Sequence, residues 1–366
     1  MLAAPVGQPG QPVSKLDRLQ RLDLLDGSPL VATPPAAPIP LQLPRGPVDW
    51  NGRTKQRWWT QFSESPWHLP ASGAESLRAT IGNRWGLAAD SVALANCQAG
   101  AWSAVLTAWG WQHPLLYPVP TNPLYAQVAR ALEIQAIAVM TGADFSFPLG
   151  QVIAAARAHQ AGVVALSNPA EPSGGLITRD EILTLARETE ALVVVDERLA
   201  IWSGFSVADA IPEVENLVVI QGLGAETGAA AFEASWILGC PRVVAVCGRV
   251  PGANGLNLPA ELAVRWVLEE TDELGYDFRA MCQARETIRA ALSQLDGVVS
   301  WPSAAPYLLV GTTLPGDELA AALLKHGIAT QTFARPPLRN CIRVFVGSEQ
   351  ENQAFIAAMT QTFKRF

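Results

Sequence analysis

Two short apolar runs, at residues 162–166 and 192–196, constrain the fold of this chain more than any other feature of its sequence. They read Gly-Val-Val-Ala-Leu and Leu-Val-Val-Val-Asp, so neither alternates between apolar and polar residues. A strand with one solvated face shows such alternation, whereas a strand buried on both faces does not. Strands of the second kind belong to parallel sheets that helices cover on both sides. We therefore expect a mostly parallel α/β sheet.

Helix and strand signals alternate on both sides of these two runs. Repeated strand–helix units predict a doubly covered sheet, and we assign residues 66–255 to this large α/β domain. We expect helices over 74–86, 100–111, 124–132, 149–159 and 179–190, and strands over 115–119, 134–140, 162–166, 191–196, 217–221, 234–238 and 243–246.

The two ends of the chain are expected to form a smaller α+β domain from residues 28–65 and 256–366. Residues 1–27 are a separate N-terminal lead that we expect to be partly disordered. Seven prolines between residues 28 and 48 disfavour both regular helix and central strand there. A long helical stretch over 259–295, bent near Gly275, leads into the C-terminal part. There we expect strands at 306–313 and 342–346, and helices at 316–326 and 350–362.

Composition excludes several classes of function. With 49% hydrophobic and 16% charged residues, the 366-residue chain suits a core-rich globular protein and not a disordered one. A net charge of −7 argues against nucleic acid as the main partner, because phosphate binding needs a basic face. The five cysteines are scattered without a C-x-x-C pair, so we expect reduced thiols and no metal site. Without an apolar run long enough for a bilayer or a signal peptide, we expect a cytoplasmic protein that does not bind membranes.

Four segments together resemble a known family. They are Trp67–Arg78, Ser167–Gly175 with the strand end at 193–197, residues 217–239, and Cys341–Asn352. Their order and spacing are similar to those of the class I/II aminotransferases of fold type I, which depend on pyridoxal phosphate (PLP). The similarity points to the branch that contains histidinol-phosphate aminotransferase and threonine-phosphate decarboxylase. It covers the chain from about residue 30 to the end, and it implies the type I aminotransferase fold and a homodimer.

The segment at 217–239 lacks the residue on which this chemistry depends. In the family this segment carries the lysine whose amine binds PLP as a Schiff base and later moves a proton. This chain has Ala225 at the corresponding position, and it contains only four lysines. A substitute amine could come only from Lys55 or Lys325.

The resemblance assigns cofactor-ring positions to three further residues. Asp196 is retained where the family pairs a carboxylate with the pyridinium nitrogen, although it could instead cap the loop after its strand. Glu171 stands where an asparagine donates to the phenolic oxygen of the ring, and Leu199 where a tyrosine supports that oxygen. The stacking aromatic falls near Asn122, where Tyr125 could substitute or could serve only for packing.

The phosphate and substrate positions differ from the family in opposite ways. Gly222 and Gly224 replace hydroxyl residues of the phosphate cup, and Glu233 replaces its arginine. Two like charges about 4 Å apart repel by about 4 kcal/mol at an intermediate dielectric constant, so Glu233 opposes a phosphate. Arg343, in contrast, matches the arginine that grips the α-carboxylate of the substrate. It could alternatively form an internal salt bridge.

Three functions remain open from the sequence. The first is an aminotransferase-like protein that has lost PLP chemistry, binds no cofactor, and acts as a non-catalytic partner or scaffold subunit. It would form a homodimer, or a heterodimer with an intact homologue. The second is an active PLP-dependent aminotransferase or phospho-amino-acid decarboxylase. The third is a binding module that uses Arg343 to hold a small carboxylate ligand.

Overall fold

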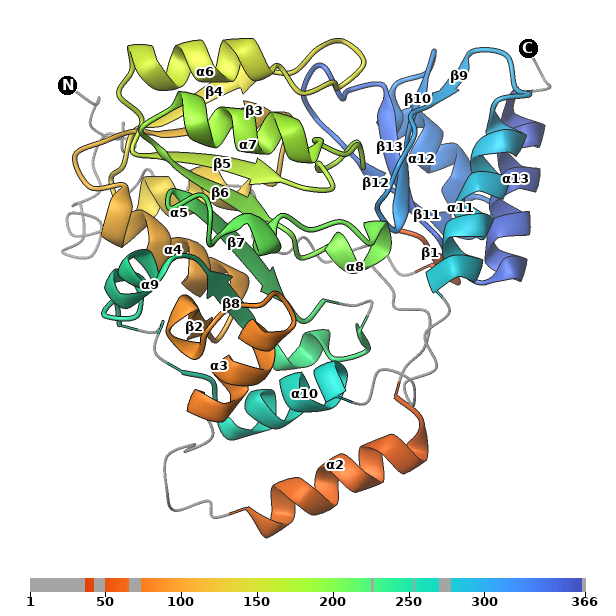
Figure 1. The fold of residues 1–366 in the computed structure, drawn as a ribbon. Helices are drawn as coiled ribbons and strands as arrows, with labels where there is room; N and C mark the ends of the chain where they lie inside the picture. Colours follow the sequence, from red (N-terminus) through yellow and green to blue (C-terminus); the bar gives the residue numbers. More distant parts are fainter. Residues whose placement is uncertain are drawn as a thin grey trace, which may run out of the picture. The chain divides into compact units, whose positions relative to one another are not determined.

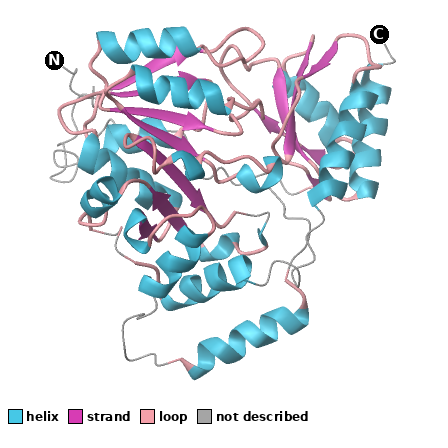
Figure 2. Ribbon diagram, in the orientation of Figure 1, coloured by secondary structure: helices cyan, strands magenta, loops and turns pink. Residues whose placement is uncertain are grey.

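The computed structural model describes residues 37–42, 50–65, 74–224, 227–251, 253, 255–269 and 278–363. Within the compact unit that runs from residue 34 to the C-terminus, a seven-stranded sheet and a four-stranded sheet are flanked by helices, and two further short strands pair with each other (Figures 1 and 2). The expected N-terminal lead, the segment at 66–73, Ala225 and the expected bend at Gly275 lie outside the described residues. No helix of the described part is long and apolar enough to cross a membrane.

The large sheet has seven strands in the order β2-β8-β7-β6-β5-β3-β4. Strands β7, β6, β5, β3 and β4 run parallel, while β8 is antiparallel to both of its neighbours. This confirms the expected α/β fold with a mostly parallel sheet. The strands are β2 (Val92–Ala95), β3 (Leu115–Val119), β4 (Ala136–Met140), β5 (Val163–Ser167), β6 (Leu192–Asp196), β7 (Leu217–Gly222) and β8 (Ser235–Leu238).

Every residue of β5 and β6 is buried, as their apolar runs predicted. Side chains of these strands point alternately into two cores, one on each face of the sheet. The first core includes residues of α3 (Ala74–Asn83), α6 (Leu149–Ala158), α7 (Arg179–Glu188) and α10 (Leu258–Glu269). The second includes residues of α4 (Gln98–Trp109), α5 (Leu124–Ala131) and α9 (Pro241–Cys247).

One expected strand is wrong, because residues 243–246 belong to helix α9. Pro241 occupies the first turn, where its missing N–H costs nothing. Val243, Val244 and Cys247 are buried while Val246 is exposed, which is helical spacing. A short apolar run cannot by periodicity alone be assigned to strand or helix.

The small sheet has the order β12-β13-β10-β9, and its core includes residues of three helices. Its strands are β9 (Val298–Ser300), β10 (Tyr307–Thr312), β12 (Gln331–Thr332) and β13 (Cys341–Phe345), and its helices are α11 (Phe278–Leu292), α12 (Gly316–Leu324) and α13 (Glu349–Phe363). A segment from near the other chain end packs on the same core. There β1 (Ile39–Pro40) pairs with β11 (Ile328–Ala329) in a separate two-stranded sheet, and Leu41 lies in the core of the small sheet.

Helix α2 (Gly52–Glu64) was not expected from the sequence and packs against α10. The Trp50 indole N–H donates to the Thr227 carbonyl, and Trp50 belongs to the core of the large domain. Trp50 and α10 therefore contribute to the core on one face of the large sheet, and α2 packs beside them. The domain boundaries drawn from the sequence stay a prediction.

Gly174 connects the loop after β5 to the segment that precedes β10. Its carbonyl accepts a hydrogen bond from the Ala304 backbone at 2.7 Å, and its φ is +80°. A Cβ at this position would lie 2.0 Å from the Ser303 hydroxyl oxygen. That hydroxyl is held in place, since it donates to the Tyr307 carbonyl and accepts from the Ala305 backbone. No side chain fits here.

We expect Gly174→Ala to lower the free energy of unfolding by about 1–3 kcal/mol, because it combines a left-handed backbone with a steric clash. The matched control is Gly175→Ala, since a Cβ there meets only the Ser173 hydroxyl at 3.7 Å. Urea denaturation of both variants measures the difference. Equal stabilities would show that the approach at Gly174 is not constrained.

Candidate functional site

Asp196 is the last residue of strand β6, and it is buried. It therefore lies at the carboxyl ends of the parallel strands, where open α/β folds bind ligands. One carboxylate oxygen accepts hydrogen bonds from the Tyr125 hydroxyl at 3.0 Å and from the Gln98 amide at 2.5 Å. The other accepts from the Arg198 backbone N–H at 3.2 Å. Asp196 therefore caps the turn after its strand, which was one of the two roles left open for it.

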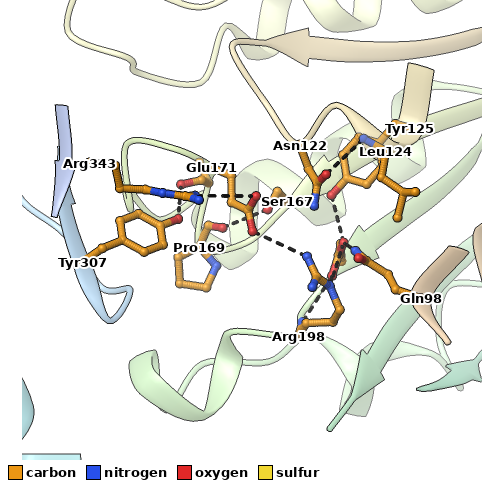
Figure 3. Close-up of polar contacts among 12 residues, drawn as sticks. Gln98, Asn122, Leu124, Tyr125, Ser167, Pro169, Glu171, Arg198, Tyr307 and Arg343 are labelled. Atoms are coloured by element: carbon orange, nitrogen blue, oxygen red, sulfur yellow. Dashed lines mark hydrogen bonds and ion pairs between the residues drawn. The ribbon is translucent and has the colours of Figure 1, made fainter. Parts of the chain in front are cut away.

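Arg198 joins this carboxylate to a second one. Its Nε lies 3.1 Å from Asp196 Oδ1, and its Nη2 lies 3.4 Å from Glu171 Oε1 (Figure 3). The side chain of Arg198 is only 25% exposed and that of Glu171 16%, so water screens the charges weakly. One guanidinium thus bridges two carboxylates. Arg198 was not among the residues predicted for the site, although a cation two residues from the candidate carboxylate Asp196 was a usable signal.

Arg343, on β13 of the small domain, continues this series of alternating charges. Its Nη1 lies 4.0 Å from Glu171 Oε2, while Nε and Nη2 donate to the Gln331 side-chain oxygen. Its guanidinium also lies over the rings of Tyr307 and Phe345, about 5 Å from each centroid. Figure 3 shows Arg343, Glu171 and Arg198 following one another toward Tyr125 and Gln98. We call Asp196, Arg198, Glu171 and Arg343 the charge row.

The charge row sets the protonation of its neighbours. Burial disfavours the cation of Arg198, but Asp196 and Glu171 outweigh this and raise its pKa above the ordinary value, so it stays charged. Burial, followed by the charges of Asp196 and Glu171, raises the pKa of Tyr125 well above 10. Tyr125 is therefore a neutral phenol that donates to Asp196, and it also packs on Trp102 with ring centroids 4.4 Å apart.

The residues predicted for the phosphate cup, Gly222, Gly224 and Glu233, carry neither a hydroxyl nor a cation. Gly222 must be glycine, because a Cβ would lie 2.6 Å from the Ala234 carbonyl oxygen. The Gly224 carbonyl accepts from the Thr227 hydroxyl. Glu233 is exposed with a left-handed backbone, and Leu199 packs with apolar residues of the small domain.

The cofactor ring can be tested against these side chains. By the resemblance, the ring nitrogen would need a free oxygen of Asp196, and the phenolic oxygen would need a donor at residue 171. Asp196 already accepts hydrogen bonds from three side chains. Glu171 is an anion, and Arg198 lies between the two carboxylates that would flank the ring. This arrangement does not fit the ring. In the described part of the chain, no group of acidic, histidine or cysteine residues could hold a metal ion either.

A second buried carboxylate, Glu197, lies beside the charge row. It accepts from the Ser206 hydroxyl, from the Val207 backbone at 2.8 Å and from the Gln221 amide at 3.1 Å. Burial raises the pKa of Glu197 to about 7, although these three donors oppose the shift. The folded state therefore binds a proton on Glu197 more tightly than the unfolded chain does.

This shift predicts a pH dependence of stability. Because the folded pKa is raised, the contribution of Glu197 is fully present below the unfolded pKa of about 4.5 and is lost as pH rises toward 7. We expect Glu197→Gln to remove this loss, so that its stability relative to wild type improves by roughly 2–3 kcal/mol between pH 4.5 and pH 8. Urea denaturation across that range measures it, with exposed Glu215→Gln as control. A pH-independent difference would contradict the buried titration.

Comparisons with known proteins agree with this fold. The chain is 28% identical over 324 residues to a histidinol-phosphate aminotransferase of Thermococcus gammatolerans, covering 88% of this chain and 91% of that protein. For a histidinol-phosphate aminotransferase of Desulfitobacterium hafniense the identity is 26% over 303 residues, covering 81% and 84%.

Solved structures share the architecture at lower identity. The histidinol-phosphate aminotransferase of Clostridium acetobutylicum superposes with a TM-score of 0.79 at 16% identity, covering 90% of this chain and all of that one. The L-threonine-O-3-phosphate decarboxylase of Porphyromonas gingivalis gives 0.77 at 19%, with coverage of 90% and 100%. The family model for aminotransferase class I and II matches residues 63–359. The chain therefore belongs to the class I and II aminotransferase family.

Proposed function

We propose that this family member has lost PLP chemistry and acts as a non-catalytic partner or scaffold subunit. The observation that carries the proposal is the Arg198 bridge between Asp196 and Glu171. A guanidinium held by two carboxylates supplies the positive charge that a pyridinium ring would otherwise bring to Asp196. Removing it would leave the buried Asp196 carboxylate without a cation and Glu171 with only Arg343 at 4.0 Å, which is unfavourable.

The positions of the lysines support the same proposal. Ala225 carries no amine, and the two lysines in the described residues lie on elements that hold no residue of the charge row. Lys55 is exposed on α2, and Lys325 is exposed at the end of α12.

A subunit role needs a surface for a partner, and α2 offers an aromatic one. Trp58 stacks on Phe62 with centroids 5.3 Å apart, and Trp59 is 53% exposed beside them. Exposed aromatic residues of this kind are enriched at protein interfaces. The partner would be a second copy or an intact homologue. Light scattering of the pure chain, and of the chain co-expressed with a lysine-bearing homologue, distinguishes these two assemblies.

The competing function is an active PLP-dependent aminotransferase or decarboxylase. The family match and the retained Asp196 favour it, and the similar proteins named above carry such activities in their names. A carboxylate-binding module is the third candidate. It would require Arg343 to release Gln331, which now accepts from two of its nitrogens.

Titration with PLP separates the first two functions. We expect no visible aldimine absorbance and no adduct that borohydride fixes to the folded protein, because no amine lies at residue 225 and Arg198 fills the ring position. A lysine-bearing homologue serves as positive control. A stoichiometric reducible adduct that Lys55→Arg or Lys325→Arg abolishes would overturn the proposal and identify the lysine.

A further inference from the structure

We propose that a hollow next to the charge row binds a small aromatic compound that is uncharged or carries an amine. The hollow has a volume of about 330 Å³ and lies between the loops after β3, β4 and β5 and the small-domain residues Trp301 and Pro302. None of Asp196, Arg198, Glu171 and Arg343 lines it. The proposal does not depend on whether the chain binds PLP.

The strand order places this hollow at a switch point of the sheet. From β3 the chain passes outward to the edge strand β4, and then returns to β5 on the other side of β3. From β5 it continues in the opposite direction through β6 to β7. Open α/β sheets bind ligands outside the carboxyl ends of their strands at such a reversal. Thr121, Thr141 and Ser167, which line the hollow, follow or end β3, β4 and β5.

The walls suit an aromatic ring. Phe145 and Trp301 meet edge to face with centroids 4.8 Å apart, and Phe147 lines the same space. Leu176 also lines it and is 45% exposed. The volume falls near the lower end of the range of small-molecule sites, roughly 300–1,000 Å³. Such a ligand would cover the exposed apolar surface.

The hollow is held in shape by its surroundings. The Gly174 approach to Ser303 fixes the loop after β5 against the segment that carries Trp301. Phe145 has a φ of +63°, an outlier for a bulky residue, and its N–H donates to the Gly142 carbonyl at 2.9 Å. Strained residues of this kind concentrate at ligand sites, where the fold keeps a side chain in a functional position.

The charges of the lining determine the ligand class. The described residues that line the hollow include no lysine and no arginine. The one charged side chain among them is that of Asp144, which is exposed. Hydrogen bonds from the Ser146 side chain and backbone lower the pKa of Asp144, so it is ionised at neutral pH. Phosphates and carboxylates are therefore disfavoured, whereas an amine can pair with Asp144. The hydroxyl residues Thr121 and Ser173 also line the hollow, and the Ser173 hydroxyl, which accepts from the Gly175 N–H, could donate to a polar group on the ligand.

Calorimetry with the full chain tests this with three probes that share one ring: tryptamine, indole and indole-3-acetate. We expect saturable binding of tryptamine at least tenfold tighter than that of indole-3-acetate, with indole between them. Asp144→Asn should remove most of the preference for tryptamine over indole. Trp301→Ala should weaken the binding of tryptamine and of indole about tenfold, because contacts with the ligand ring are lost. Trp111→Ala, at an exposed tryptophan that does not line the hollow, is the matched control.

Gly175→Val keeps the proposal testable if Trp301→Ala fails to fold. A Cβ at Gly175 has room, and Gly175 lines the hollow, so a larger side chain should block it and abolish binding. Tryptamine binding that is absent at millimolar concentration in wild type, unchanged in Gly175→Val, or matched by indole-3-acetate would overturn the proposal. None of these results changes the outcome of the PLP titration, so the proposed ligand hollow and the proposed loss of PLP chemistry can fail independently.

Discussion

The charge of Asp196 must be compensated inside the protein, and much of the site follows from how this is done. A buried carboxylate without partners would shift its pKa or destabilise the fold. Here the turn after β6 returns Arg198 to the carboxylate of Asp196, two residues earlier in the chain. Another nitrogen of that guanidinium, Nη2, lies beside the Glu171 carboxylate. The other oxygen of Glu171 lies 4.0 Å from Arg343 Nη1. Opposite charges therefore alternate from the large domain into the small one.

The register of the large sheet makes this row possible. Ser167 of β5 is paired with Asp196 of β6, so the loop that follows β5 begins beside the carboxylate. Glu171 lies in that loop, and the Tyr307 hydroxyl of the small domain donates to the Ala170 carbonyl next to it. The same loop carries Gly174, whose close approach to Ser303 joins the two domains. Ala170 and Ser173 of this loop also line the proposed ligand hollow.

The central strands and most helices could be predicted because they depend on local patterns. The unbroken apolar runs of β5 and β6 required burial on both faces, and this is what the structure shows. Residues 243–246 could not be assigned because a short valine-rich run suits either helix or strand.

The site was harder to predict, since its contacts link residues far apart in the chain. Glu171 was recognised as an anion opposed to the cofactor, but its pairing with Arg343 depends on how the domains pack. Arg198 was overlooked because no family position drew attention to it.

A double-mutant cycle on Arg198 and Glu171 tests most directly the central claim that Arg198 compensates the buried carboxylates. We predict that Arg198→Met lowers the free energy of unfolding at pH 7 by about 2 kcal/mol or more. In the double variant with Glu171→Gln, the loss should be at least about 1 kcal/mol smaller than the sum of the two single losses, because the carboxylate that Arg198 compensates is then neutral. Additive losses from the two substitutions would mean that Arg198 does not neutralise Glu171, and would contradict the account.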